Sequence, residues 1–102
     1  MIETPTRVMF DSNLNTKFKV RHEVYGDVDL ELIDVTCTPN ASSDYEGFSL
    51  TFIDATNRPL PQQTYAMEHG EMGKFDLFIV PVKSDARGRY YQAIFNRLVP
   101  QN

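Results

Sequence analysis

Residues 60–82 read LPQQTYAMEHGEMGKFDLFIVPV. The stretch begins at a proline-flanked turn, passes through one short strand pattern and reaches a glycine-containing turn at 69–73. It ends in an apolar run from Leu77 to Val82 that is almost free of polar residues. A strand with one face in water alternates apolar and polar residues, whereas a strand covered on both faces does not. We therefore expect a strand here whose second apolar face is covered by the rest of the chain or by a partner.

Strand patterns recur about every ten residues along the chain, separated by clusters of Gly, Pro, Asn, Asp and Ser. This spacing is typical of antiparallel sandwiches and barrels. No segment shows a convincing helical periodicity, and no internal repeat is evident. The sequence therefore predicts one all-β domain over residues 1–102, a small antiparallel barrel or sandwich of six to seven strands with meander hairpins. Residues 1–7 are expected to form a loose N-terminal segment.

The first hairpin can be predicted residue by residue, because apolar and charged residues alternate on both sides of its turn. Opposite residues of a hairpin share a face, so the pattern places Val24 across from Val28 with a three-residue loop between them. The same register pairs Arg21 with Glu31 on the solvent face. At 33–35 the alternation slips by one residue, which predicts a β-bulge.

The charge distribution limits the classes of partner. The net charge is −4, with ten acids against four bases in residues 1–54 and four acids against six bases in residues 55–102. An acidic protein is a poor candidate for non-specific nucleic-acid binding, which depends on basic surfaces. No apolar window approaches the length of about 18 residues that a membrane span needs, and no secretory signal pattern is present. One cysteine, Cys37, suits a reducing compartment, so we expect a cytoplasmic protein without a membrane partner.

Histidines and carboxylates offer the only arrangement that resembles a chemical site. Glu68, His69 and Glu71 lie close in sequence and could in principle bind a metal or transfer protons. Adjacent strand residues point to opposite faces, so Glu68 and His69 diverge, and a backbone hydrogen bond at the turn is the favoured role of His69. His22 falls on the apolar face of the first hairpin as a core or rim histidine. We expect no catalytic residue, no metal, no cofactor and no enzymatic activity; Cys37 has no base nearby in the sequence.

Several segments resemble a known family: FSLTF at 48–52, LPQQTY at 60–65, EHGEMGKFDLFIVPV at 68–82 and YQAIFN at 91–96. The family consists of short bacterial proteins classified as a domain of unknown function. The resemblance implies a small β protein, offers no established activity, and links such proteins with phage-derived or tail-like gene neighbourhoods. Gln63 stands where the family often has Gly, so a tight turn at that position is not implied.

Two function hypotheses of different classes follow. The leading one is a non-enzymatic protein-interaction or structural module that self-associates or docks in a larger assembly. The contacting face is expected to contain Phe78, Val80, Val82, Tyr65, Tyr91 and Phe95, although an internal sandwich core would explain the same apolar face. The alternative is a small-ligand-binding barrel with a rim that contains His22, Tyr45 and His69.

A third and less favoured hypothesis is a nucleic-acid-binding small barrel. It rests on a basic and aromatic cluster near the C-terminus that could neutralise phosphates and stack on bases. A solvated turn with core tyrosines explains the cluster equally well, and the acidity of the whole chain argues against nucleic acid. The cluster comprises Lys83, Arg87, Arg89 and Arg97 with Tyr90 and Tyr91.

Overall fold

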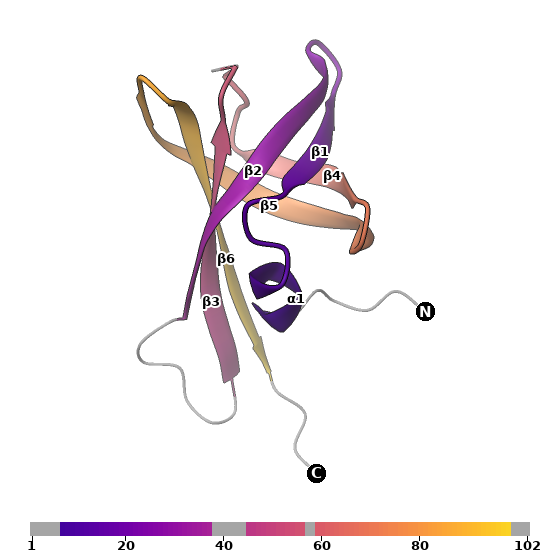
Figure 1. Ribbon diagram of the computed structural model, residues 1–102, viewed down its shortest axis with the longest axis vertical. Helices are drawn as coiled ribbons and strands as arrows, with labels where there is room; N and C mark the ends of the chain where they lie inside the picture. Colours follow the sequence, from indigo (N-terminus) through magenta and orange to yellow (C-terminus); the bar gives the residue numbers. More distant parts are fainter. Residues whose placement is uncertain (1–6, 38–44, 57–58, 99–102) are drawn as a thin grey trace.

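The computed structural model describes residues 7–37, 45–56 and 59–98. Six antiparallel strands close into a barrel in the order β1-β2-β3-β6-β5-β4, and a short helix lies at one end (Figure 1). The predicted all-β class is confirmed, and of the barrel and sandwich that the sequence left open, with six to seven strands, the structure is a six-stranded barrel. The strands are β1 (Lys17–His22), β2 (Gly26–Cys37), β3 (Tyr45–Asp54), β4 (Gln63–His69), β5 (Gly73–Asp85) and β6 (Gly88–Leu98).

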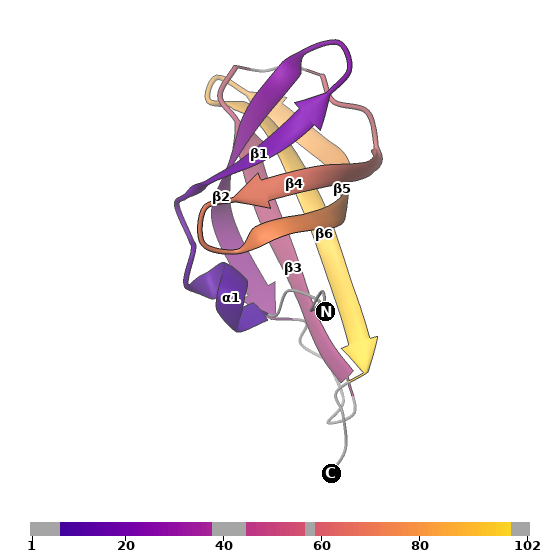
Figure 2. The same ribbon diagram turned by 90° about the vertical axis from the view of Figure 1, so that its right-hand side faces the viewer.

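The barrel consists of two three-stranded meanders, β1-β2-β3 and β4-β5-β6, joined along two seams of unequal length. β3 and β6 pair over ten residue pairs, from Tyr45 opposite Leu98 to Asp54 opposite Arg89. β1 and β4 pair only through Lys19 with Glu68 and Val20 with Met67. We call this β1–β4 contact the short seam. Figure 2 shows the two strands side by side at the seam and diverging beyond it.

Large aromatic and aliphatic side chains fill the interior of the barrel. Their rings pack edge to face in several places, as where the Phe18 and Phe52 centroids lie 5.5 Å apart at 80°. Side chains on alternating positions of every strand contribute, which matches the period-two pattern of the sequence. The largest fully buried side chains are Tyr91, Phe10, Phe18, Phe48, Phe52, Leu30, Leu32, Leu50, Leu60, Met67, Ile79 and Val20.

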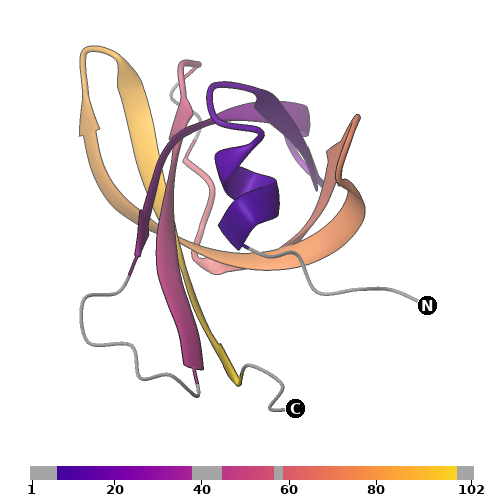
Figure 3. The same ribbon diagram turned by 60° about the horizontal axis from the view of Figure 1, so that its bottom comes forward.

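The helix α1 (Arg7–Asp11) corrects the expectation that the chain has no helix. Figure 3 shows α1 within the open end of the barrel. Phe10 is fully buried, and its ring lies 6.0 Å from that of Phe48 and 5.8 Å from that of Phe75. A five-residue helix is too short to show a 3.6-residue periodicity. Tertiary burial of Phe10, rather than an amphipathic pattern, therefore holds α1 in place.

The turn of the first hairpin lies two residues earlier than predicted. His22 pairs with Gly26, so the loop is 23–25, and Val24 is 80% exposed instead of lying across from Val28. Gly26 adopts a positive φ of 72°, a conformation that glycine reaches without steric cost and that ends the turn. The alternation of side chains is unchanged by a shift of two residues, so the pattern could not distinguish the two registers.

The shifted register changes the cross-strand charge pairs. Arg21 lies opposite Asp27, not opposite Glu31 as predicted. The bulge predicted farther along β2 is confirmed, because the pairing with β3 shifts between Leu32 and Asp34.

The hairpin of β4 and β5 corresponds to the hairpin of β1 and β2 with an offset of 47 residues, which is the separation of His22 and His69. In each hairpin a histidine ends the first strand and pairs with a glycine of positive φ that begins the second, Gly26 at 72° and Gly73 at 81°. The buried positions also correspond: Val20 and Val28 in one hairpin match Met67 and Phe75 in the other. The correspondence lies in backbone geometry and burial and not in the sequence, because KFKVRH and TYAMEH share few identities.

Candidate functional site

Two surface grooves lie at opposite ends of the short seam. With the offset of 47 residues between the two hairpins, the β1 wall of each groove corresponds to the β4 wall of the other. One has a volume of about 440 Å³, the other about 280 Å³. We call them the His69 groove and the His22 groove after the histidine in each. The His69 groove is lined by Lys17, Lys19, Asp29, Glu68, His69, Gly70, Gly73 and Lys74. The His22 groove is lined by Arg21, His22, Glu23, Gln63, Thr64, Tyr65 and Ala66.

In the His69 groove both ring nitrogens of the histidine make hydrogen bonds. The backbone N–H groups of Glu71 and Met72 donate to Nδ1 at 3.0 and 3.2 Å. Because Nδ1 accepts, the ring is neutral and carries its proton on Nε2, which donates to Thr16 Oγ1 at 2.8 Å. The Thr16 hydroxyl in turn donates to the carbonyl of Asn13 at 2.6 Å. His69 therefore holds a turn and a loop together and has no nitrogen left for a metal or a proton-transfer step.

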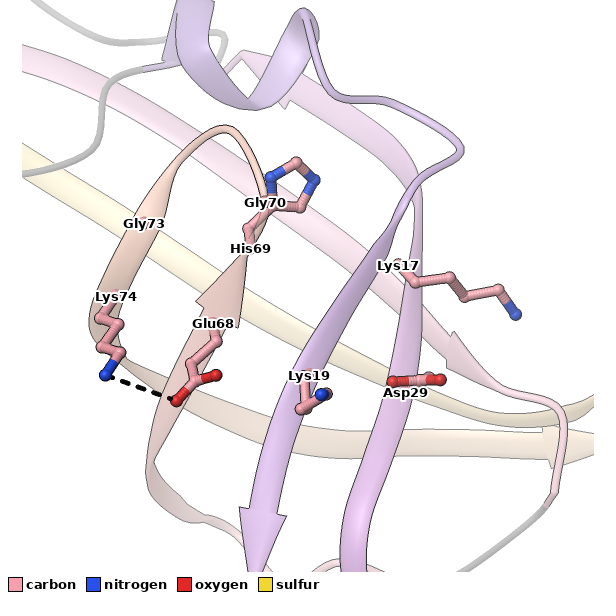
Figure 4. A pocket seen from close by; sticks show the side chains of 8 residues that line it. All are labelled: Lys17, Lys19, Asp29, Glu68, His69, Gly70, Gly73 and Lys74. Carbon is pink, nitrogen blue, oxygen red and sulfur yellow. Dashed lines mark ion pairs between the residues drawn. The ribbon is translucent and has the colours of Figure 1, made fainter.

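The charged side chains around the His69 groove form a mixed surface. Glu68 Oε1 lies 3.4 Å from Arg21 Nη2 and 3.9 Å from Lys74 Nζ, the second of which is drawn in Figure 4. Lys19 Nζ lies 4.0 Å from a carboxylate oxygen of Asp27. Such exposed pairs contribute little to stability. The described residues contain no group of three or more His, Cys, Asp or Glu side chains arranged to hold a metal ion.

In the His22 groove the histidine makes only half of the corresponding contacts. Backbone N–H groups of Val24 and Tyr25 donate to Nδ1 at 3.0 and 3.3 Å, so Nε2 carries the proton here as well. The ring stacks on Tyr25 with centroids 4.7 Å apart and lies 6.3 Å from the ring of Tyr65. Within the part of the chain that the structure describes, Nε2 has no hydrogen-bond partner. His22 thus lies close to the rings of two tyrosines, Tyr25 and Tyr65.

The walls of the His22 groove are the edges of two diverging strands. Beyond Val20 and Met67 the register of the short seam would continue through residues 21–22 of β1, and residue 23 of the adjoining turn, opposite residues 63–66 of β4. These are the residues that line the groove. On the side of β4 that faces the groove, no strand of the described chain pairs with residues 63–66, which pair with β5 on the other side.

The predicted interface residues do not all share one surface. Tyr65 and Tyr91 were expected on the contacting face, but they are 2% and 0% exposed and point into the barrel. The Tyr91 hydroxyl accepts the backbone N–H of Leu60 at 3.0 Å, and the Tyr65 hydroxyl donates to the carbonyl of Pro61 at 2.6 Å. Burial raises the pKa of both tyrosines. Strand alternation alone could not tell the inward face of the final strands from their outward face.

The remaining predicted residues are outward or lie outside the description. Phe78 and Val82 are 49% and 50% exposed on β5, and Val80 is half-buried between them. Ile94 on β6, which the sequence reasoning did not select, is 66% exposed. We call these four residues the outer patch. The side chains of Cys37, Tyr45 and Phe95 lie outside the described residues.

The tyrosine rings of the basic and aromatic cluster near the C-terminus are not exposed for stacking. Tyr90 is 5% exposed and Tyr91 is buried, so neither ring is free to stack on a base. Lys83 Nζ instead lies 4.6 Å from the centroid of the Tyr90 ring. At the adjoining turn the backbone N–H of Arg87 donates to Asp85 at 2.8 Å, and this hydrogen bond lowers the pKa of the Asp85 carboxyl. A solvated turn over core tyrosines therefore describes the cluster.

No helix among the described residues is long and apolar enough to cross a membrane.

Comparisons with known proteins place the chain in a family. Neither the curated proteins nor the solved structures contain a match to the chain. One family model, described as a domain of unknown function (DUF6916), matches residues 5–95 and confirms the predicted resemblance to an uncharacterised domain family. The chain therefore belongs to the DUF6916 family.

Proposed function

We propose that the protein is a non-enzymatic interaction module that docks through the outer patch, with a second copy of the chain as its partner. The observation that supports this proposal is the exposure of Phe78, Val82 and Ile94 on the outward face of β5 and β6. Large exposed apolar side chains are candidates for a contact surface in soluble proteins. We further propose that the module is a cytoplasmic component of a larger assembly, phage-derived as the sequence resemblance implies.

The two hairpins indicate that the barrel itself does not require this patch. The position equivalent to Phe78 in the first hairpin is Glu31, 47 residues earlier. The same outward position of the same fold therefore accommodates a carboxylate. An apolar residue there is better explained by a contact outside the barrel than by packing within it.

The backbone next to the patch is also open to contact. The pairing of β5 with β6 ends at Val80 opposite Gln92, while β6 continues to Leu98 along β3. In the described residues, positions 93–98 of β6 thus have a strand partner on one side only. An unpaired strand edge beside exposed apolar side chains offers a second strand both hydrogen bonds and burial.

The test is the solution mass of the full chain, measured by size-exclusion chromatography with light scattering over a range of concentrations. We expect a mass of about twice that of one chain, as a two-fold contact through one patch requires. The Phe78→Glu variant, which copies Glu31 of the first hairpin, is expected to be monomeric with an unchanged circular dichroism spectrum.

The matched control is Val24→Glu, which places the same charge at an 80% exposed apolar residue on the first turn. This control should remain dimeric. A wild-type chain that is monomeric at every concentration contradicts the proposal. An unfolded Phe78→Glu variant also contradicts it, because Phe78 would then be needed for the barrel itself.

A further inference from the structure

We propose that the His22 groove binds an extended peptide segment of a partner protein, which pairs with the free edge of β4. In this arrangement an oxygen of the peptide accepts the hydrogen bond that His22 Nε2 has to offer, and a basic residue of the peptide faces Glu23. The proposal is independent of the outer patch, which lies on β5 and β6.

The His69 groove shows what the His22 groove lacks. In the former, Nε2–H of the histidine donates to the hydroxyl of Thr16, a residue of the segment that precedes β1. The equivalent of Thr16 in the second half is Gln63, 47 residues later, and the structure shows no hydrogen bond between its side chain and His22. The same histidine geometry is therefore satisfied within the chain at one end of the seam and left open at the other. An added acceptor at His22 would complete the arrangement that Thr16 completes at His69.

The form of the groove selects an extended main chain as the occupant. Its two walls are the edges of residues 21–22 of β1 and 63–66 of β4, and Glu23 of the turn adjoins the first of them. A strand edge presents N–H and C=O groups with the repeat of an extended chain, so strand addition satisfies several groups with one ligand. A compact ligand could satisfy only a few of them.

The charges of the groove select the kind of peptide. Arg21 is held by Glu68 at 3.4 Å and by Asp27 at 4.0 Å. Glu23, by contrast, has no cationic partner among the described residues. The unbalanced charge at the groove is therefore negative, and a lysine or arginine of the peptide would balance it.

The experiment is a titration of the ¹⁵N-labelled full chain with a blocked hexapeptide of alternating threonine and lysine, followed by the backbone amide chemical shifts. We expect shifts confined to residues 21–25 and 63–66, with saturation in the millimolar range. A second peptide has proline at the third and fifth positions and the same net charge. Because proline removes main-chain donors, this peptide should bind about tenfold more weakly.

Three variants separate the contributions of the groove. Glu23→Gln should weaken binding about two- to fivefold, as the loss of one partly exposed ion pair does. Gln63→Thr introduces the residue that closes the His69 groove and should weaken binding because its hydroxyl competes for His22. Glu71→Gln, an exposed acid in the other hairpin turn, is the control and should bind like the wild type.

Several outcomes would overturn the proposal. They include an absence of shifts at the highest peptide concentration, and shifts that map to β5 and β6 instead. Equal binding of the proline peptide would exclude strand pairing. Equal binding by Glu23→Gln and Glu71→Gln would show that Glu23 makes no specific contact with the peptide.

Discussion

Thr16 occupies a position where one hydroxyl serves two hydrogen bonds at once. It accepts from His69 Nε2 at 2.8 Å and donates to the carbonyl of Asn13 at 2.6 Å. The chain of bonds continues through His69 Nδ1 to the backbone of the second turn. Removing a member of such a network leaves a part-buried donor or acceptor without a partner, which costs more than the bond itself contributes.

We therefore expect Thr16→Val to lower the free energy of unfolding by about 1–3 kcal/mol. Valine keeps the β-branched shape of threonine but lacks the hydroxyl, whereas Thr16→Ser keeps the hydroxyl and should restore most of the loss. Urea denaturation followed by circular dichroism measures both variants. If Thr16→Val and the wild type have the same midpoint, the network does not stabilise the fold.

Among the elements, α1 depends most on a single contact. Phe10 is fully buried against Phe18, Phe48 and Phe75, whereas Val8 in the same helix is 61% exposed. The five residues of α1 form too short a helix to be stable alone. The helix and the end of the barrel that it covers therefore rely on each other.

Truncation of Phe10 to alanine should destabilise the protein by about 3–5 kcal/mol, the range for a fully buried phenylalanine. Val8→Ala in the same helix should change the free energy of unfolding by less than about 0.5 kcal/mol. Thermal and urea denaturation of both variants gives the comparison. Similar effects of the two substitutions would mean that α1 does not close the barrel.

The positions of the strands could be predicted from the sequence, whereas the pairing between strands could not. The short strand pattern expected before the glycine-containing turn at 69–73 corresponds to β4, and the strand expected at the apolar run corresponds to β5, whose Phe75, Leu77 and Ile79 are buried. The hairpin register was missed because moving the turn by two residues changes the cross-strand register by four, an even number that preserves the alternation.

The candidate site was predicted only in fragments for a related reason. His22 and His69 were recognised as turn or rim histidines, but the two grooves depend on a pairing between strands 47 residues apart. The repeat itself lies in burial and backbone geometry rather than in residue identity, as the match of Phe18 with Tyr65 illustrates. Single-sequence patterns carry no information on such distant pairings, so the open contact of His22 could not be foreseen.

At the scale of the whole molecule, buried tyrosines make the stability of the barrel dependent on alkaline pH. Burial is the main cause that raises the pKa of Tyr65, Tyr90 and Tyr91 above the ordinary value near 10. A raised pKa in the folded state means that folding favours the neutral phenol. The corresponding stability is fully present below about pH 10 and is lost as the pH rises through the raised values.

We expect the free energy of unfolding to fall steeply between about pH 10 and pH 12, beyond the fall caused by the loss of lysine charge. Urea denaturation at a series of pH values measures it, with tyrosinate absorbance as the record of ionisation. Tyr91→Phe should be less stable at neutral pH, because Leu60 loses its acceptor, but its stability should fall less steeply with pH. A slope identical to that of the wild type would contradict this assignment.

The short seam has a consequence for the order of events in folding. Its two pairs join residues about 47 positions apart, so the chain has to restrict a long loop in exchange for few contacts. The two meanders and their ten-pair contact can form first, and closure at β1 and β4 comes last and is undone first. A peptide bound in the His22 groove would bridge the strands at this point of closure. The partner would be bound by the barrel and would at the same time slow the opening of the barrel.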